Sequence, residues 1–316
     1  MDNLDPAAPY RRPELLALGY TDSDLRTLRN RGHLTSLRRG CYLAGPAPRE
    51  PAERHRIQAR AALELLTTTA TLCHASAAVL HDLPTWRIPL RRVHVVRAQG
   101  SGGRLHRQVH LWTAPLTPSE IVLVDGLPVT SVARTVVDLA RSVPFESALA
   151  TADAALARRL VTRTELDRAL ARAKGWRGCP LARSVVAFAD GRAESVGESR
   201  SRLALAQAGL LPPVLQWEVR GADGRVVGRT DFGWPAHRVG GEFDGRTKYG
   251  RLLRPGQDPG DALFDEKLRE DELRSEGVTI VRWTWSDLAD FASTATRLRR
   301  ALNAPGTRTV DPAREF

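Results

Sequence analysis

Residues 230–244, with the sequence TDFGWPAHRVGGEFD, decide how the last third of the chain folds. Two strands are expected here, Val226 to Trp234 and Val239 to Asp244, with a four-residue turn between them. If the hairpin is regular, Trp234 pairs with Val239 and Asp231 lies opposite Glu242. Because side chains alternate along a strand, Asp244 then shares the face of Glu242. The aromatic residues of both strands point to the opposite face, and they are Phe232, Trp234 and Phe243.

Three crowded carboxylates, those of Asp231, Glu242 and Asp244, repel one another unless a cation neutralises them. A hard divalent cation is the usual partner of such a group, so we expect Mg²⁺ or Mn²⁺ at this place. Lys248 follows closely in a chain with few lysines, and its ammonium group suits a developing phosphate charge. The alternative is a solvated acidic hairpin edge beside a stray lysine.

A helix from about Ser195 to Gly209 precedes the strands and carries Glu198 near its start. Ser195 and Glu198 have the spacing of a capping box, in which the glutamate bonds the backbone amide of the N-cap residue. Glu198 therefore has a structural interpretation beside a catalytic one. The helix that ends near Gly277 carries Lys267, Arg269 and Arg274, which either follow a DNA backbone or pair with neighbouring acidic residues.

Residues 194–290 resemble the restriction-endonuclease-like fold of the PD-(D/E)XK type, and specifically a bacterial family related to very short patch repair endonucleases. The resemblance rests on Glu198, residues 230–232 (TDF), residues 241–245 (GEFDG), the helix from Glu266, and residues 278–283 (VTIVRW). It implies that Asp231 and Glu242 bind metal, with Glu198 in support. Asp244 stands where the general motif has lysine, which puts hydrolysis in doubt; Lys248 is a candidate replacement.

Residues 8–48 have the pattern of a winged helix-turn-helix. One helix spans Arg11 to Leu18, a second follows the cap at Thr21 and ends near Arg31, and a hairpin is expected over 33–43. The second helix of this motif enters the major groove of DNA. Small helical hairpins also serve only for packing, and that alternative stays open. The candidate DNA contacts are Arg26, Arg29, Asn30, Arg38 and Arg39.

Residues 52–185 form a mixed α/β middle segment. Strands are expected at 91–99 and 105–114, joined by a glycine-rich loop, and helices at 132–142, 145–159 and 164–174. The interval from Trp86 to Trp112 holds six arginines and three histidines but no acidic residue. Arg91 and Arg92 are therefore candidates for a phosphate-facing surface, with a solvated sheet face as the alternative.

Residues 11–140 also resemble the AbiEi type of antitoxin and transcriptional regulator. The matching stretches, after the helix-turn-helix, are residues 74–84 (HASAAVLHDLP) and 129–135 (VTSVART). The resemblance implies a DNA-binding regulator and a toxin or effector protein as a possible partner. His74 and His81 are expected to be packing residues, because no third metal ligand lies near them in the sequence.

Composition limits the classes of protein to which the chain can belong. The net charge is +11, which favours a polyanionic partner, although only three of the 47 basic residues are lysines and the arginine bias has a compositional origin too. No apolar stretch is long enough for a membrane span, and the three separated cysteines suggest a reduced, cytoplasmic protein. We expect an α+β or α/β multidomain protein, with a restriction-endonuclease-like α/β/α domain at 190–304 and a disordered tail at 305–316.

Two functions are compatible with these patterns. The first is a DNA-binding protein whose nuclease-like domain hydrolyses phosphodiester bonds with Mg²⁺ or Mn²⁺. The second is a non-catalytic regulator of the AbiEi type with a degenerate nuclease domain. Duplex DNA is the expected partner in both.

Overall fold

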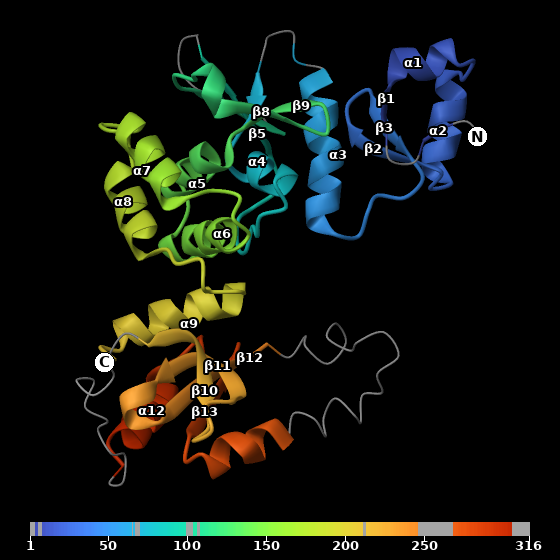
Figure 1. Ribbon diagram of the computed structural model, residues 1–316. Coiled ribbons are helices and arrows are strands. Elements are labelled where there is room, and N and C mark those ends of the chain that lie inside the picture. The colour runs from blue at the N-terminus through green and yellow to red at the C-terminus, as the bar shows by residue number, and fades with distance from the viewer. Residues whose placement is uncertain are drawn as a thin grey trace. The chain divides into compact units, whose positions relative to one another are not determined.

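The chain folds into two compact units, Met1–Ala189 and Asp190–Phe316 (Figure 1). The computed structural model describes residues 4–5, 8–64, 66, 70–98, 104–105, 108–210, 213–245 and 268–304, so the expected tail at 305–316 lies outside the described residues. The architecture is α+β, because helices accompany three sheets that are antiparallel or mixed. Within the described residues, no helix combines the length and the apolar character needed to cross a bilayer.

The first unit begins with a small sheet and two helices. Thr21 starts the second helix, because its hydroxyl accepts the amide of Asp24 while the Asp24 carboxylate accepts the amide of Thr21. Leu15, Leu25 and Leu34 form the core under these elements. The strands are ordered β1-β3-β2 and are antiparallel. The elements are β1 (Pro9–Arg11), α1 (Arg12–Ala17), α2 (Asp22–Asn30), β2 (Leu34–Arg38) and β3 (Cys41–Ala44).

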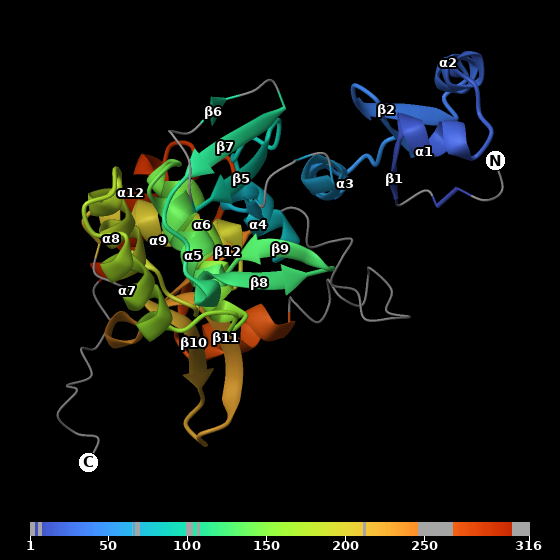
Figure 2. The same ribbon diagram turned by 90° about the horizontal axis from the view of Figure 1, so that it is seen from above.

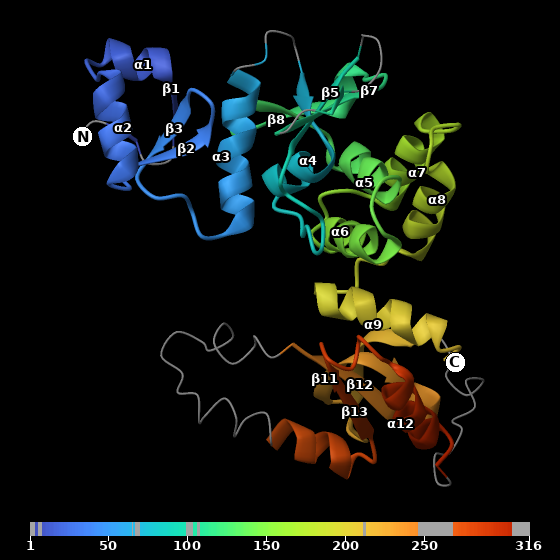
Figure 3. The ribbon, with the colours of Figure 1, turned by 180° about the vertical axis from the view of Figure 1, so that it is seen from behind.

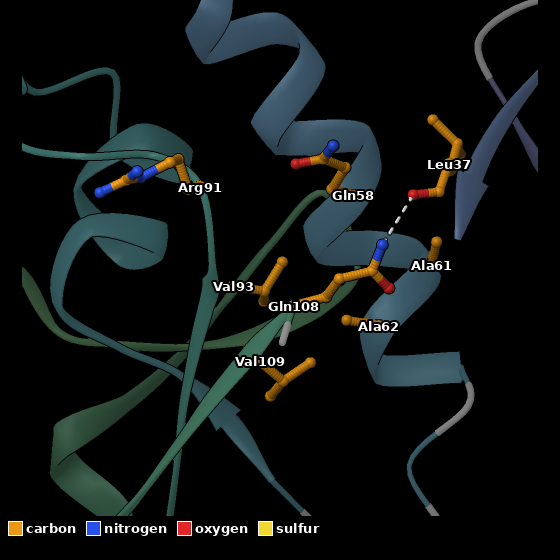
Figure 4. Close-up of a pocket in the computed structure, with 8 residues that line it drawn as sticks. All are labelled: Leu37, Gln58, Ala61, Ala62, Arg91, Val93, Gln108 and Val109. Atoms are coloured by element: carbon orange, nitrogen blue, oxygen red, sulfur yellow. Dashed lines mark hydrogen bonds between the residues drawn. The ribbon is translucent and has the colours of Figure 1, made fainter. Parts of the chain in front are cut away.

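Helix α3 (Pro51–Glu64) lies between this small sheet and the larger sheet of the same unit (Figures 1 and 3). Figure 4 shows the junction, where the Gln108 side-chain amide donates to the Leu37 carbonyl at 3.4 Å. The cavity beside it has a volume of only about 50 Å³. That space suits a few waters and no larger ligand, so we read the junction as packing.

The larger sheet has six strands in the order β6-β7-β5-β4-β9-β8. The two strands expected in the basic middle segment are present as β5 and β7, but they pair in parallel and do not form a simple hairpin. The connection between them contains β6, which pairs antiparallel with β7. The strands are β4 (Thr71–Leu72), β5 (Val93–Arg97), β6 (Arg104–Leu105), β7 (Val109–Thr113), β8 (Ile121–Val124) and β9 (Leu127–Thr130).

Helix α5 is the centre of the helical layer and contacts the other four helices of that layer. Its Arg134 is 2% exposed and bonds the carboxylates of Asp138 and Glu120 at 2.8 and 3.2 Å. Arg134 is therefore the centre of an internal ion-pair network. The helices are α4 (His74–Leu80), α5 (Val132–Ala140), α6 (Phe145–Ala157), α7 (Arg163–Arg172) and α8 (Cys179–Phe188), the last of which the sequence analysis did not predict.

The second unit is built on a four-stranded sheet in the order β10-β11-β12-β13. The first three strands are antiparallel neighbours, and β13 runs parallel to β12. Figure 2 shows β10 and β11 extending side by side. The elements are α9 (Val196–Gln207), β10 (Val214–Arg220), β11 (Val226–Trp234), β12 (Val239–Asp244), β13 (Thr279–Thr284) and α12 (Ala292–Leu302), with a further helix at 268–275.

Helices cover both faces of this sheet. Phe232, Trp234 and Phe243 share one core with Leu205 of α9 and Leu298 of α12, which confirms the aromatic face predicted from the strand pattern. A second core contains Leu273, from the helix at 268–275, packed against Val219 and Val278. The unit therefore has three layers, helix, sheet and helix.

Candidate carboxylate site

Glu198 lies in the first turn of α9, and its side chain is almost fully buried. Its Oε1 accepts the Ser195 hydroxyl at 2.7 Å, and its Oε2 accepts the Glu194 amide at 2.9 Å. One half of the expected capping box is present, because the Ser195 hydroxyl accepts the Glu198 amide. In the other half, the Glu198 carboxylate accepts the amide of Glu194, the residue before the N-cap. Burial raises the pKa of Glu198, and the nearby Asp231 carboxylate raises it further.

Gln216 completes the surroundings of Glu198, since its side-chain amide donates to Glu198 Oε2 at 2.8 Å. Gln216 has a φ of 54°, a left-handed conformation that is strained for a residue with a side chain. It lies between the pairs Leu215–Phe232 and Trp217–Thr230, at the level of Asp231 on the neighbouring strand. Strain of this kind often accompanies functional sites.

Asp231 lies where β11 and β12 stop pairing. The register begins with Trp234 opposite Val239, as predicted, and its last pair is Phe232 opposite Gly241. Beyond this point Asp231 Oδ2 accepts the backbone amide of Phe243 at 2.8 Å. The carboxylate therefore reaches toward the backbone of β12, and the expected cross-strand pair with Glu242 is not among the ladder pairs of the described residues.

Glu242 is held by two arginines. Its Oε1 accepts Arg269 at 2.8 Å and its Oε2 accepts Arg282 at 2.8 Å. Arg282 also donates to Glu270 at 2.7 Å. Burial works to lower the pKa of Arg282, but its hydrogen bonds to Glu270 and Glu242 outweigh burial and raise it. Among the described residues, guanidinium groups thus supply the positive charge that we expected a cation to bring to Glu242.

Asp244 is the last residue of β12 and is half-buried beside Thr284 of β13. No described residue forms a hydrogen bond or ion pair with its carboxylate. Lys248 and Lys267 lie outside the described residues. In the described part of the chain, no three metal-binding side chains converge on one point. Glu198 and Asp231 lie near enough for the Asp231 carboxylate to raise the pKa of Glu198 beyond the effect of burial.

The predicted DNA-contacting side chains of α2 are exposed, while Leu25 of the same helix is buried. They are Arg26, Arg29 and Asn30. Arg39 is exposed in the turn after β2, and the side chain of Arg38 lies outside the described part. Arg91 is exposed and Arg92 half-buried just before β5. These basic residues are accessible to a polyanion.

Sequence reasoning missed Gln216 and Arg282 as parts of the carboxylate site. Leu215, Gln216 and Trp217 alternate apolar, polar and apolar as in a regular strand, so no signal in the sequence marked Gln216. Arg269 was noted only as a DNA contact or a helix ion pair, and it binds Glu242 instead. Arg274 forms ion pairs with Glu270 and Asp271, which confirms the predicted alternative of pairing with neighbouring acidic residues.

Comparison with known proteins gives relatives in one organism. The chain is 34% identical over 212 residues to the uncharacterized proteins Rv2248 and MT2308 of two Mycobacterium tuberculosis strains; the match covers 67% of this chain and 73% of each relative. No family profile matches. The crystal structure of the RV2827C protein from the same species aligns with a TM-score of 0.39 and 18% identity, over 68% of this chain and 84% of that one. By its identity and coverage, the chain belongs to the protein family of Mycobacterium tuberculosis Rv2248 and MT2308.

Proposed function

We propose that this protein binds duplex DNA and that its second unit hydrolyses phosphodiester bonds with a divalent cation. The observation that carries the proposal is the approach of Asp231 to the buried Glu198, two carboxylates from separate elements. Burial raises the pKa of Glu198, repulsion from Asp231 raises it further, and a cation relieves such repulsion. The three-layer order of helices around a mixed sheet supports a restriction-endonuclease-like unit of the PD-(D/E)XK type.

The donor set fits Mg²⁺ or Mn²⁺ in part. The oxygens of Asp231 and Glu198 are the hard ligands that these ions prefer, and Asp244 adds a third carboxylate at the end of β12. Glu242 joins them only if its oxygens leave Arg269 and Arg282. A bound cation supplies an activated water and polarises a phosphoryl oxygen. We keep Lys248 as the candidate cation for the phosphate.

The protein's own residues have separate tasks in this proposal. Gln216 holds Glu198 through its side-chain amide, and the Phe243 amide orients Asp231. Helix α2 and the turn after β2 present basic side chains to a DNA groove, as a winged helix-turn-helix does. The buried, free cysteines Cys41, Cys73 and Cys179 are compatible with a reducing cytoplasm.

A second function has its own support. With both of its oxygens bound by guanidinium groups, Glu242 is neutralised without a metal. This arrangement is sufficient for a regulator of the AbiEi type. In such a regulator the nuclease-like unit has lost its chemistry and serves as a scaffold. A toxin or effector protein is then the expected second partner beside DNA.

A DNA cleavage assay distinguishes the nuclease from the regulator. The purified chain is incubated with supercoiled plasmid and short duplexes in Mg²⁺, Mn²⁺ or EDTA. The nuclease proposal predicts nicked or linear products with either metal and none with EDTA, and loss of activity in Glu198→Gln. Glu218→Gln, an exposed carboxylate change on the same sheet, is the matched control and retains activity. DNA binding without cleavage in either metal contradicts the nuclease proposal and supports the regulator.

A further inference from the structure

A hollow in the first unit has a volume of about 280 Å³. Its wall comes from the start of α4, from β5 and β7, from the segment before β5, and from the end of α5 with the residues that follow. The residues that matter for its chemistry are His74, Arg91, Arg92, His94, His110 and Trp112. None of the described residues that line it is acidic.

Flat rings form one wall of this hollow. Trp112 stacks on His110 with ring centroids 3.9 Å apart, and on His74 with centroids 4.1 Å apart. The planes differ by 22° and 12°, so the three rings are nearly parallel. His110 and Trp112 are only half-buried and remain accessible. His74 and His110 cover opposite faces of the Trp112 indole, so a planar heterocycle can extend the stack only at the outer face of the half-buried His110 ring.

The ring wall carries little charge of its own. The Trp112 indole N–H donates to His94 Nδ1 at 3.1 Å, so that nitrogen bears no proton. Burial lowers the pKa of His94 to about 3, and burial holds the pKa of His74 well below its ordinary value. Burial and the nearby Arg92 lower the pKa of His110 as well. At neutral pH the imidazoles are therefore neutral hydrogen-bonding groups.

Positive charge enters at the rim, through Arg91 and Arg92. The segment from Trp86 to Trp112 contains no aspartate or glutamate, and no carboxylate of a described residue forms an ion pair with Arg91. A guanidinium group binds phosphate through paired N–H donors. His74 also has a φ of 49°, the strained left-handed region, as residues at ligand clamps often do.

We propose that this hollow binds a single nucleotide, with its base against the stacked rings and its phosphate at Arg91 and Arg92. A neutral aromatic wall beside a cationic rim matches a ligand with a flat heterocycle and an anionic group. The volume lies near the lower end of small-ligand pockets, about 300–1,000 Å³, which suits one nucleotide. The proposal goes beyond the proposed function, because it requires neither cleavage nor duplex binding by α2. The nucleotide is either free or an unpaired unit of a strand.

Calorimetric titration of the full chain tests the site. The probes are deoxyadenosine monophosphate, deoxyadenosine, inorganic phosphate and a 5′-phosphorylated single-stranded dodecamer. We expect the monophosphate to bind at least about tenfold more tightly than the nucleoside or phosphate alone, because both halves of the site contribute. Tighter binding of the dodecamer identifies a strand unit as the ligand, and tighter binding of the monophosphate identifies a free nucleotide.

Variants tie the binding to the hollow. Arg91→Ala and His110→Ala should each weaken monophosphate binding about tenfold, and Trp112→Phe should retain binding that Trp112→Leu loses. Arg183→Ala, an exposed arginine of α8 outside the hollow, removes the same charge and should leave binding unchanged. Thermal melting verifies that each variant is folded. No binding of any nucleotide probe, or equal loss in Arg91→Ala and Arg183→Ala, overturns the proposal; a failed cleavage assay does not bear on it.

Discussion

Arg282 Nε donates to Glu242 Oε2 at 2.8 Å, between residues that are direct partners in the parallel pair β12–β13. The Glu242 side chain is only 12% exposed, so this contact and the one from Arg269 replace hydrogen bonds to water. Arg282→Gln should lower the free energy of unfolding by about 1–3 kcal/mol, because a buried carboxylate loses a charged hydrogen bond. Urea unfolding measures the change.

The same variant addresses competition between arginine and metal. If Glu242 is a ligand once it is released, Arg282→Gln should gain more thermal stability from Mg²⁺ than the parent protein does. Arg274→Ala is the control, since that side chain is 68% exposed and its surface ion pairs contribute little. An identical response to Mg²⁺ in all three proteins excludes Glu242 from any metal site.

Glu198 makes stability depend on pH in a defined direction. Its pKa in the folded protein is raised above the ordinary 4.5 by burial and by Asp231. Its contribution is therefore fully present below the pKa of the unfolded chain and is lost as pH rises through the folded pKa. The free energy of unfolding of the parent, minus that of Glu198→Gln, should fall as pH increases above 4.5 and then level off. A difference that is flat or rises between pH 4 and 7 contradicts the burial of a repelled carboxylate.

The ring of Phe243 leaves no room for a side chain at position 197, which is therefore occupied by glycine. A Cβ at this position would lie 1.9 Å from Phe243 Cε1. Alanine favours a helix over glycine by about 1 kcal/mol, but overpacking of the ring should cost more, about 1–3 kcal/mol net. The loss should shrink in a Phe243→Leu background, and a double-mutant cycle measures that coupling. Strictly additive losses refute the contact.

The exposed arginines of α2 should contribute affinity for DNA. Arg26→Ala and Arg29→Ala should each weaken duplex binding by ~1–3 kcal/mol if they contact bases, or lower the salt slope by about 1 if they contact phosphate. Arg183→Ala is again the matched control. Binding and salt dependence that remain unchanged in fluorescence titrations remove α2 from the DNA interface.

Local patterns in the sequence were enough to predict the strands of the second unit and its aromatic face. The alternation around Phe232 and the turn at 235–238 depend only on neighbouring residues, and the Trp234–Val239 pair follows from them. The ladder's end near Asp231 was not predictable in this way, because there the Asp231 carboxylate accepts the Phe243 amide, a contact that strand alternation does not encode.

The arginine partners of Glu242 could not be predicted from local sequence patterns either. Arg269 and Arg282 lie far along the chain, and they reach Glu242 only because β13 pairs in parallel with β12 and a helix covers that face. A parallel pair requires a crossover whose path is not encoded in strand periodicity. In the first unit, the parallel pairing of β5 with β7 escaped prediction for the same reason.

If Asp231 takes part in binding a divalent cation, calorimetric titration of Mg²⁺ and Mn²⁺ will distinguish the parent chain from Asp231→Asn. An asparagine oxygen can still accept the Phe243 amide, and one charge beside Glu198 disappears, so the metal-free variant should be as stable as the parent or slightly more so. We predict saturable binding heat for the parent and none for the variant. Absence of metal binding by the parent, or unchanged binding by Asp231→Asn, contradicts the account and leaves the carboxylates with a structural role.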